Sequence, residues 1–195
     1  MNYIKKYIKQ TVSFYETIDL KKILQIENLI LNKIKNKKQI FTCGNGGSAS
    51  VANHFLCDFN KGIKISSKQK LIPKVISLSD NIETILAVSN DINFNKVFCS
   101  QLENLGYKGD LLITMSCSGS SSNIVEAIKF AKKKNITTLS LTGFASKKIQ
   151  KLSDLNFDVG VKNYGISEDI FQSLMHMISQ NIRYKHSSNR EEKVY

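Results

Sequence analysis

The sequence predicts an α/β protein whose parallel sheet is covered by helices on both faces. Short apolar runs that suit buried strands alternate along the chain with segments in which apolar residues recur at helical spacing. Two of these runs also end directly in a glycine- or serine-rich turn that opens a helix. Because ligands of parallel sheets bind at the carboxyl ends of the strands, the functional site is expected at these two turns.

The periodicity places each element in turn. Strands are predicted at 39–43, 74–78, 111–115, 137–142 and 155–161, and helices at 4–15, 20–35, 49–59, 82–88, 94–105, 123–134, 147–152 and 168–184. The two helices before the first strand are amphipathic and need a partner surface on this sheet or on another subunit. We therefore divide the chain into N-terminal helices at 1–36, a main domain at 37–185 and a polar tail at 186–195.

The composition limits the cellular context and the partners. A chain of 195 residues can bury a substantial single core, and its four cysteines form no CxxC pair, as is usual for thiols in a reducing compartment. No signal peptide is apparent, and no stretch approaches the roughly 18 apolar residues of a membrane span. We therefore expect a cytoplasmic protein that does not bind a membrane.

The formal net charge of +12 also raises the question of nucleic acid. The lysines are scattered and no basic stripe with interleaved aromatic residues occurs, so we expect no nucleic-acid partner. The positive field would instead favour an anionic substrate.

The turn after the strand at 111–115 is the strongest candidate for ligand binding. Its five hydroxyls belong to Ser116, Ser118, Ser120, Ser121 and Ser122, and Gly119 lets backbone approach a ligand closely. Free N–H groups and the dipole at the start of the next helix favour a phosphate. A single serine here could simply cap the helix, but five hydroxyls favour phosphate binding.

A second turn follows the first strand, with the sequence Asn45, Gly46, Gly47 and Ser48. It also joins a strand to a helix and is a second possible anion cradle. Alone it could be a tight turn in which Ser48 caps the helix. Its similarity in kind to the serine turn favours a role in binding.

Two pairs of side chains could transfer protons or bind a metal. His54 and Asp58 are four residues apart on one predicted helix, and Glu168 and His176 are eight apart on the last one, so each pair shares a helix face. If the two helices meet, the four residues form a cluster suited to proton transfer or to zinc. Each residue taken singly also fits an ordinary structural role.

We interpret Cys57 and Cys117 as small core residues.

Taken together, the motifs resemble those of the sugar isomerase (SIS) domain and, within it, of the phosphoheptose isomerases. The matching segments are GNGGSASVANHF at 44–55, VSND at 88–91, QLENLGYKGD at 101–110, SCSGSSSNIVEAI at 116–128 and SLTG at 140–143. The resemblance implies a flavodoxin-like parallel sheet sandwiched by helices. It also implies a homotetramer that associates through helical bundles, with active sites at the subunit interfaces. The N-terminal helices would then pack in these bundles.

The resemblance assigns roles to individual positions. Ser116, Ser118 and Ser121 match the phosphate-binding serines, and Asn45 and Ser48 match the other substrate-binding turn. Gly46, Gly47, Gly119, Asn90 and Asp91 fall within the same motifs and are expected to bind substrate as well.

The catalytic positions match the family less closely. Some members bind zinc through a His-x-x-x-Glu pair and a Gln and His eight apart, which correspond here to His54, Asp58, Glu168 and His176. Asp58 therefore replaces a glutamate, and Glu168 replaces a glutamine. Asp58 with His176 are the direct candidates for acid–base catalysis, but the shorter aspartate leaves Glu168 as an alternative base. Zinc held by all four residues would polarise the substrate oxygens.

The implied reaction converts D-sedoheptulose 7-phosphate to D-glycero-D-manno-heptose 7-phosphate, as a precursor of heptose in lipopolysaccharide or capsule. Two alternatives stay open. One is an isomerase of another sugar phosphate, because a serine turn recognises phosphate and not the number of carbons. The other is a non-catalytic SIS protein that senses a sugar phosphate or binds a protein such as the replication initiator. Both histidines, each with a carboxylate on its helix, favour the enzyme.

Overall fold

A computed structural model describes residues 2–144 and 147–187. Its sheet has the strand order β2-β1-β3-β4-β5 within the described residues, and every neighbouring pair is parallel. The strands are β1 (Ile40–Gly44), β2 (Val75–Ser77), β3 (Leu111–Ser116), β4 (Thr137–Thr142) and β5 (Leu155–Asp158). This is the flavodoxin-like order, so the predicted fold class is confirmed.

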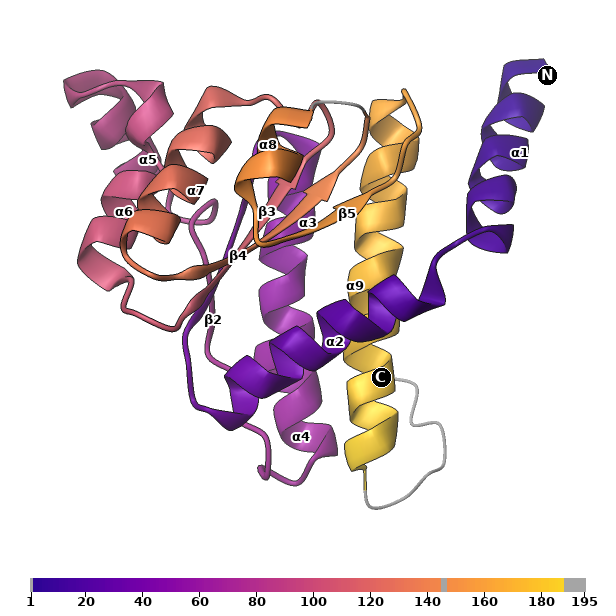
Figure 1. Cartoon of the computed structure of the whole chain (residues 1–195), viewed down its shortest axis with the longest axis horizontal. Coiled ribbons are helices and arrows are strands. Elements are labelled where there is room, and N and C mark those ends of the chain that lie inside the picture. The colour runs from indigo at the N-terminus through magenta and orange to yellow at the C-terminus, as the bar shows by residue number, and fades with distance from the viewer. Residues whose placement is uncertain (1, 145–146, 188–195) are drawn as a thin grey trace.

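Helices cover both faces of the sheet (Figure 1). One face packs against α2 (Leu20–Lys35), α3 (Gly47–Cys57) and α9 (Tyr164–His186), and the other against α6 (Cys99–Leu105), α7 (Ser122–Lys133) and α8 (Lys147–Leu152). Strand β3 shows the consequence, since Leu111 and Ile113 belong to the first core and Leu112 to the second. A strand buried on both faces is apolar at most positions, and the buried Thr114 within it satisfies its hydroxyl against Ser140 Oγ at 2.7 Å.

Several helices differ from their predicted bounds. Helix α5 (Ile82–Asp91) continues three residues past its predicted end at position 88, and the helix predicted at 94–105 is a 3-10 turn, η2 (Phe94–Lys96), followed by α6. Helix α9 begins four residues early because the Asn163 side chain accepts a hydrogen bond from Ile166 N at 3.1 Å, which caps the helix. It also continues to His186, into the predicted tail, whose residues 188–195 lie outside the described part.

Helix α3 does not end at Phe59 but changes its winding. At Asp58 it passes into a π-helical turn, η1 (Asp58–Ile63), and then into the short α4 (Lys64–Ser66). Wider π turns are frequent at functional sites because they rotate the side chains that follow relative to a regular helix. Asp58 is the first residue of this turn.

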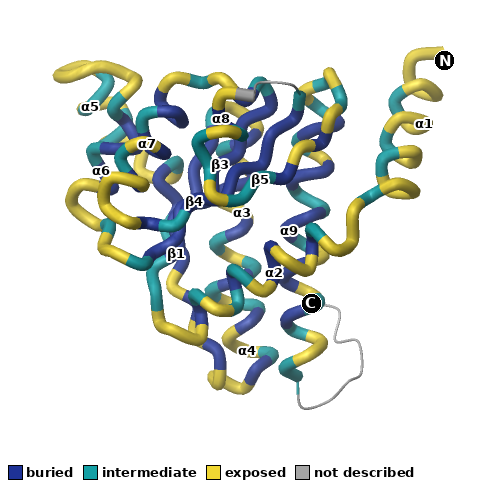
Figure 2. The backbone as a smooth tube through the Cα atoms, viewed as in Figure 1, coloured by how far each residue is buried: buried dark blue, intermediate teal, exposed yellow. Residues whose placement is uncertain are grey.

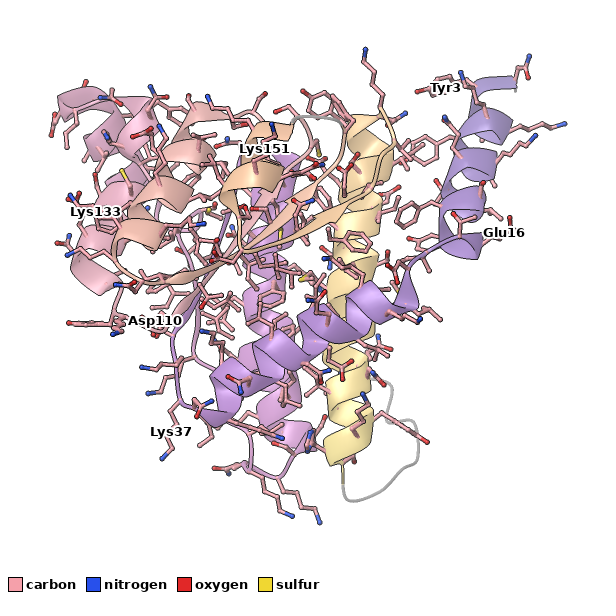
Figure 3. The ribbon with its side chains drawn as sticks, in the orientation of Figure 1. Tyr3, Glu16, Lys37, Asp110, Lys133 and Lys151 are labelled. Carbon is pink, nitrogen blue, oxygen red and sulfur yellow. The ribbon has the colours of Figure 1, made fainter. Side chains whose placement is uncertain are left out.

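Helix α1 (Asn2–Glu16) stands beside the N-terminal part of α9, at the edge of the molecule (Figure 1, Figure 2). It has no buried residue, whereas α2 contributes Ile26 and Ile30 to the main core. Tyr7 Oη donates to Asp169 Oδ2 at 2.5 Å, and Tyr15 Oη lies 2.6 Å from Ser173 Oγ. Figure 3 labels Tyr3 and Glu16 near the two ends of this helix. Tyr7 and Phe14 also pack, partly buried, against the main core, with the Phe14 ring edge-on to Phe157 at 6.3 Å, so α1 is attached through a few polar and aromatic contacts.

The amino ends of the strands form the opposite edge of the sheet from the ligand turns. Asp110, labelled in Figure 3, precedes β3 and accepts hydrogen bonds from the backbone N–H groups of Gln39 and Tyr107 at 3.0 and 2.8 Å.

Among the described helices, none has the length and apolar character needed to cross a lipid bilayer.

Candidate active site

The two predicted turns meet at the point where the strand order reverses. Strands β1 and β3 are neighbours, so the turns that follow them, Gly44–Ser48 and Ser116–Ser121, lie side by side at the carboxyl edge. Between them is a cavity of about 390 Å³. Its lining includes seven of the residues predicted to bind substrate, Asn45, Gly46, Gly47, Ser48, Ser116, Ser118 and Ser121, and the predicted catalytic residue Glu168, together with Met115, Cys117 and Tyr164.

Glycine is required in the first turn for steric reasons. A Cβ atom at Gly44 would lie 2.5 Å from the Ser48 carbonyl oxygen, and Gly46 has a φ of +55°, which side chains disfavour. The Asn45 and Asn123 side chains exchange amide hydrogen bonds of 3.0 and 2.8 Å. This pair ties the first turn to the start of α7 and fixes the spacing of the two turns.

The serine turn has the arrangement of an anion cradle. Gly119 N donates to Ser116 Oγ at 3.1 Å, and the Ser116 and Ser121 hydroxyls are 3.4 Å apart. Gly119 has a φ of +63° and lets the chain fold back into α7, although it does not itself line the cavity. The hydroxyls and the N-terminus of α7 together suit a phosphate dianion.

Glu168 projects from α9 into the wall of the cavity. Its Oε1 accepts a hydrogen bond from Ser48 Oγ at 3.1 Å, and the Cys117 Sγ lies 3.7 Å from the same oxygen. A Cβ atom at Gly47 would lie only 2.2 Å from Glu168 Oε2, so the carboxylate rests directly against the glycine turn. Of the residues that line the cavity, Glu168 alone carries a carboxylate.

The cysteine in the cavity is a neutral thiol. Burial is the main cause that raises the pKa of Cys117 to about 11, with a further contribution from the nearby Glu168. Because the thiolate is the reactive form, this environment does not suit a nucleophile. Cys117 is 3% exposed, which confirms the interpretation as a core residue, but the same interpretation is wrong for Cys57, whose side chain is exposed near the end of α3.

Three of the four predicted ligands come together between α3 and α9. His54 Nε2 lies 3.0 Å from His176 Nε2, and the Asp58 oxygens lie 3.5 and 3.4 Å from these two nitrogens. Ligand atoms of all three residues fall within 4.8 Å of one another. Their separation allows a proton to pass between Asp58 and His176, either directly or through one water.

Glu168, expected in the same cluster, lies outside this group of described residues. Eight residues of helix separate it from His176, a rise of about 12 Å, and its carboxylate turns instead to Ser48. Gln172 takes the neighbouring place, with Nε2 2.8 Å from His176 Nε2. The sequence analysis missed Gln172, although its i, i+4 spacing from His176 was a usable signal.

Asn90 and Asp91 do not line the cavity. They end α5, are exposed, and bond to each other through Asn90 Nδ2 and Asp91 Oδ1 at 2.8 Å. Within one chain they therefore do not contribute to the pocket. Tyr164, which does line it, was also missed because the start of α9 was placed too late.

The fold and the pocket define an α/β protein with a cavity suited to a phosphate group at the switch point of its sheet. The sequence profile of the SIS domain family matches residues 2–143. The phosphoheptose isomerase of Campylobacter concisus is 34% identical over 169 residues, which cover 86% of this chain and 88% of that protein. The phosphoheptose isomerase of Helicobacter pylori strain 26695 is 39% identical over 131 residues, or 67% of each chain.

A solved structure agrees with these matches. The phosphoheptose isomerase of Neisseria gonorrhoeae superposes with a TM-score of 0.82 at 27% identity, covering 93% of this chain and 95% of that one. The chain belongs to the phosphoheptose isomerase family of SIS-domain proteins.

Proposed function

We propose that the protein is a phosphoheptose isomerase that interconverts D-sedoheptulose 7-phosphate and D-glycero-D-manno-heptose 7-phosphate. The observation that carries the proposal is a single cavity with a phosphate-type serine turn on one side and the Glu168 carboxylate on the other. The names of the most similar relatives support the choice of sugar.

The phosphate is assigned to the serine turn. Hydroxyls of Ser116, Ser118 and Ser121 line the cavity there, and the N-terminus of α7 adds about half a positive charge. With the C7 phosphate held in this turn, the other end of the sugar extends toward Ser48 and Glu168. This places C1 and C2, where the reaction occurs, near a carboxylate.

The reaction moves a proton between these two carbons. A base removes a proton from C1 of the ketose, which gives an enediol, and returns it to C2, while a second group transfers a proton from the C1 hydroxyl to O2. Glu168 is the first candidate for the base because it is the carboxylate in the lining. Asp58 is the second, because it lies 3.4 Å from His176 Nε2, with which it could share protons.

The donor set between α3 and α9 also fits a zinc ion. Two imidazole nitrogens and a carboxylate within 4.8 Å are ligands that zinc prefers, and both recorded ion pairs of Asp58 among the described residues are to the two histidines. We propose His54, Asp58 and His176 as ligands, with the amide oxygen of Gln172 as a fourth donor after rotation of the amide. When bound, zinc would act as a Lewis acid toward substrate oxygens.

We further propose a homotetramer with active sites at subunit interfaces. Ile4, Ile8 and Val12 recur every four residues on α1 and are 65%, 56% and 49% exposed, so one face of this helix is apolar and uncovered. Ile82 and Leu86 form a similar exposed pair on α5, one turn before Asn90 and Asp91. Burial of these surfaces against other subunits would bring the two polar residues toward a neighbouring site.

The expected setting is the cytoplasm, where the heptose phosphate would feed synthesis of a surface glycan. The four cysteines are free among the described residues, which agrees with a reducing compartment.

Turnover of D-sedoheptulose 7-phosphate tests the proposal, with the aldose measured by NMR in the wild type and in the Ser118→Ala, Glu168→Gln and Asp58→Asn variants. Ser118→Ala should mainly raise KM. Loss of kcat by about a hundredfold or more in Glu168→Gln, with a smaller loss in Asp58→Asn, would identify Glu168 as the base, and the reverse order would identify Asp58. Tight binding of the sugar phosphate without any turnover would favour the sensing alternative, and turnover of a different sugar phosphate would favour the other isomerase.

A further inference from the structure

The pocket contains two anion cradles of similar construction, and the chain itself fills one of them. Each cradle is a turn with a positive-φ glycine, Gly46 or Gly119, followed by a helix of more than ten residues. At the first cradle the Glu168 carboxylate lies over Gly47, since a Cβ atom there would be 2.2 Å from Oε2, 2.6 Å from Cδ and 2.8 Å from Oε1. Its Oε1 also accepts a hydrogen bond from the Ser48 hydroxyl.

Within residues 2–144 and 147–187, no carboxylate is bonded to the second cradle. The recorded partners of the Ser116, Ser118 and Ser121 side chains are neutral hydroxyl and N–H groups of the same turn. The two helix N-termini therefore differ in what they offer a ligand. The N-terminus of α7 offers hydrogen-bond donors that face no negative charge of the described residues, whereas the N-terminus of α3 presents the negative charge of Glu168.

We infer that Glu168 sets the charge selectivity of the pocket, so that it accepts sugar monophosphates and rejects bisphosphates. The inference rests on the proposed sugar-phosphate pocket. When one phosphate occupies the serine turn, the far end of the sugar meets the Glu168 carboxylate in a cavity of about 390 Å³. A sugar hydroxyl there donates a hydrogen bond to the carboxylate, whereas a second phosphate would meet a like charge at close range.

Position 168 carries this discrimination because of its geometry as well as its charge. Gly47 has no side chain, so the carboxylate reaches the backbone at the start of α3 and occupies the place that a phosphate would take. The chain also supplies a matched control. Asp169, the next residue, is exposed, does not line the cavity, and pairs with Tyr7 instead. Asp169→Asn therefore changes the net charge of the protein by the same amount as Glu168→Gln without changing the pocket.

The test compares the binding of two probes by isothermal titration calorimetry at fixed ionic strength. The probes are sedoheptulose 7-phosphate and sedoheptulose 1,7-bisphosphate, and the proteins are the wild type, Glu168→Gln, Glu168→Ala and Asp169→Asn, each checked by circular dichroism. The wild type and Asp169→Asn should bind the bisphosphate about tenfold or more weakly than the monophosphate. Both Glu168 variants should lose most of this difference.

Equal or tighter binding of the bisphosphate by the wild type would overturn the inference, as would a difference that survives in both Glu168 variants. Because binding is measured without turnover, the outcome is separate from that of the proposed reaction. A protein that selects the monophosphate but does not isomerise it would refute the isomerase and leave the selectivity intact.

Discussion

The contact between Glu168 and Gly47 makes a quantitative prediction for Gly47→Ala. The new Cβ atom would lie 2.2 Å from Glu168 Oε2, whereas ordinary contact begins at 3.4 Å, so the carboxylate must retreat by roughly 1.2 Å. This movement stretches the 3.1 Å hydrogen bond from Ser48 beyond useful length. A hydrogen bond to a charged group contributes about 1.5–3 kcal/mol, and for this half-buried carboxylate we expect about 1–2 kcal/mol.

The same substitution has a favourable effect that acts in the opposite direction. Alanine is a better helix former than glycine by up to about 1 kcal/mol, and Gly47 is the first residue of α3. Gly47→Ala alone should therefore destabilise the protein by about 0.5–1 kcal/mol. In a Glu168→Ala background the clash is absent, and the same change should stabilise by a similar amount.

Urea denaturation followed by circular dichroism measures the four free energies of unfolding in this cycle. The expected coupling between positions 47 and 168 is about 1–2 kcal/mol. Gly46→Ala is the control, because its Cβ atom would meet nothing within 4 Å and its cost of about 1–3 kcal/mol arises from the backbone conformation alone, with φ +55° and ψ −128°. A coupling for Gly47→Ala below about 0.3 kcal/mol, equal to that of the control, would refute the placement of Glu168.

Three further predictions concern the metal, the thiols and the assembly. Asp58→Asn should weaken zinc binding by at least about tenfold in a calorimetric titration, while Asp169→Asn should leave it unchanged, and equal affinities would contradict the ligand assignment. Iodoacetamide at pH 8 should label Cys57 well before Cys117. Because the thiolate is the nucleophile, labelling of Cys117 should accelerate as the pH rises from 9 toward the Cys117 pKa of about 11. Equal labelling rates of the two cysteines at pH 8 would count against a buried, neutral thiol at Cys117. Ile8→Glu should lower the mass measured by light scattering relative to the wild type, because it places a charge on the apolar face of α1, and an unchanged tetramer would show that this face is not an interface.

Local patterns were sufficient to predict the architecture. The predicted bounds of the second helix, 20–35, match α2, because its apolar stripe and its flanking polar residues define both ends. The two ligand turns were also identifiable, since a glycine or serine cluster directly after a buried strand has few other uses in a parallel sheet. The order β2-β1-β3-β4-β5 then places them side by side.

The details of the site depended on information that spacing does not contain. Spacing put Glu168 and His176 on one helix face, but it could not tell that the glutamate would turn to Ser48 and leave Gln172 beside the histidine. The choice is made by the packing of α9 against α3, and by a glycine at position 47 that leaves room for a carboxylate. The π-helical turn at Asp58 likewise has no signature in the local sequence pattern.

The most direct test of the account is to incubate the protein with D-sedoheptulose 7-phosphate in D₂O and to follow both sugars by NMR. An enediol mechanism predicts that the heptose 7-phosphate forms with deuterium at C2, because the carboxylate base exchanges its proton with solvent. The Glu168→Gln variant should show neither the heptose 7-phosphate nor the deuterium. The assignment as an isomerase would be contradicted if the wild type binds the sugar phosphate but forms no aldose and incorporates no deuterium. This result would have to hold both with and without added zinc.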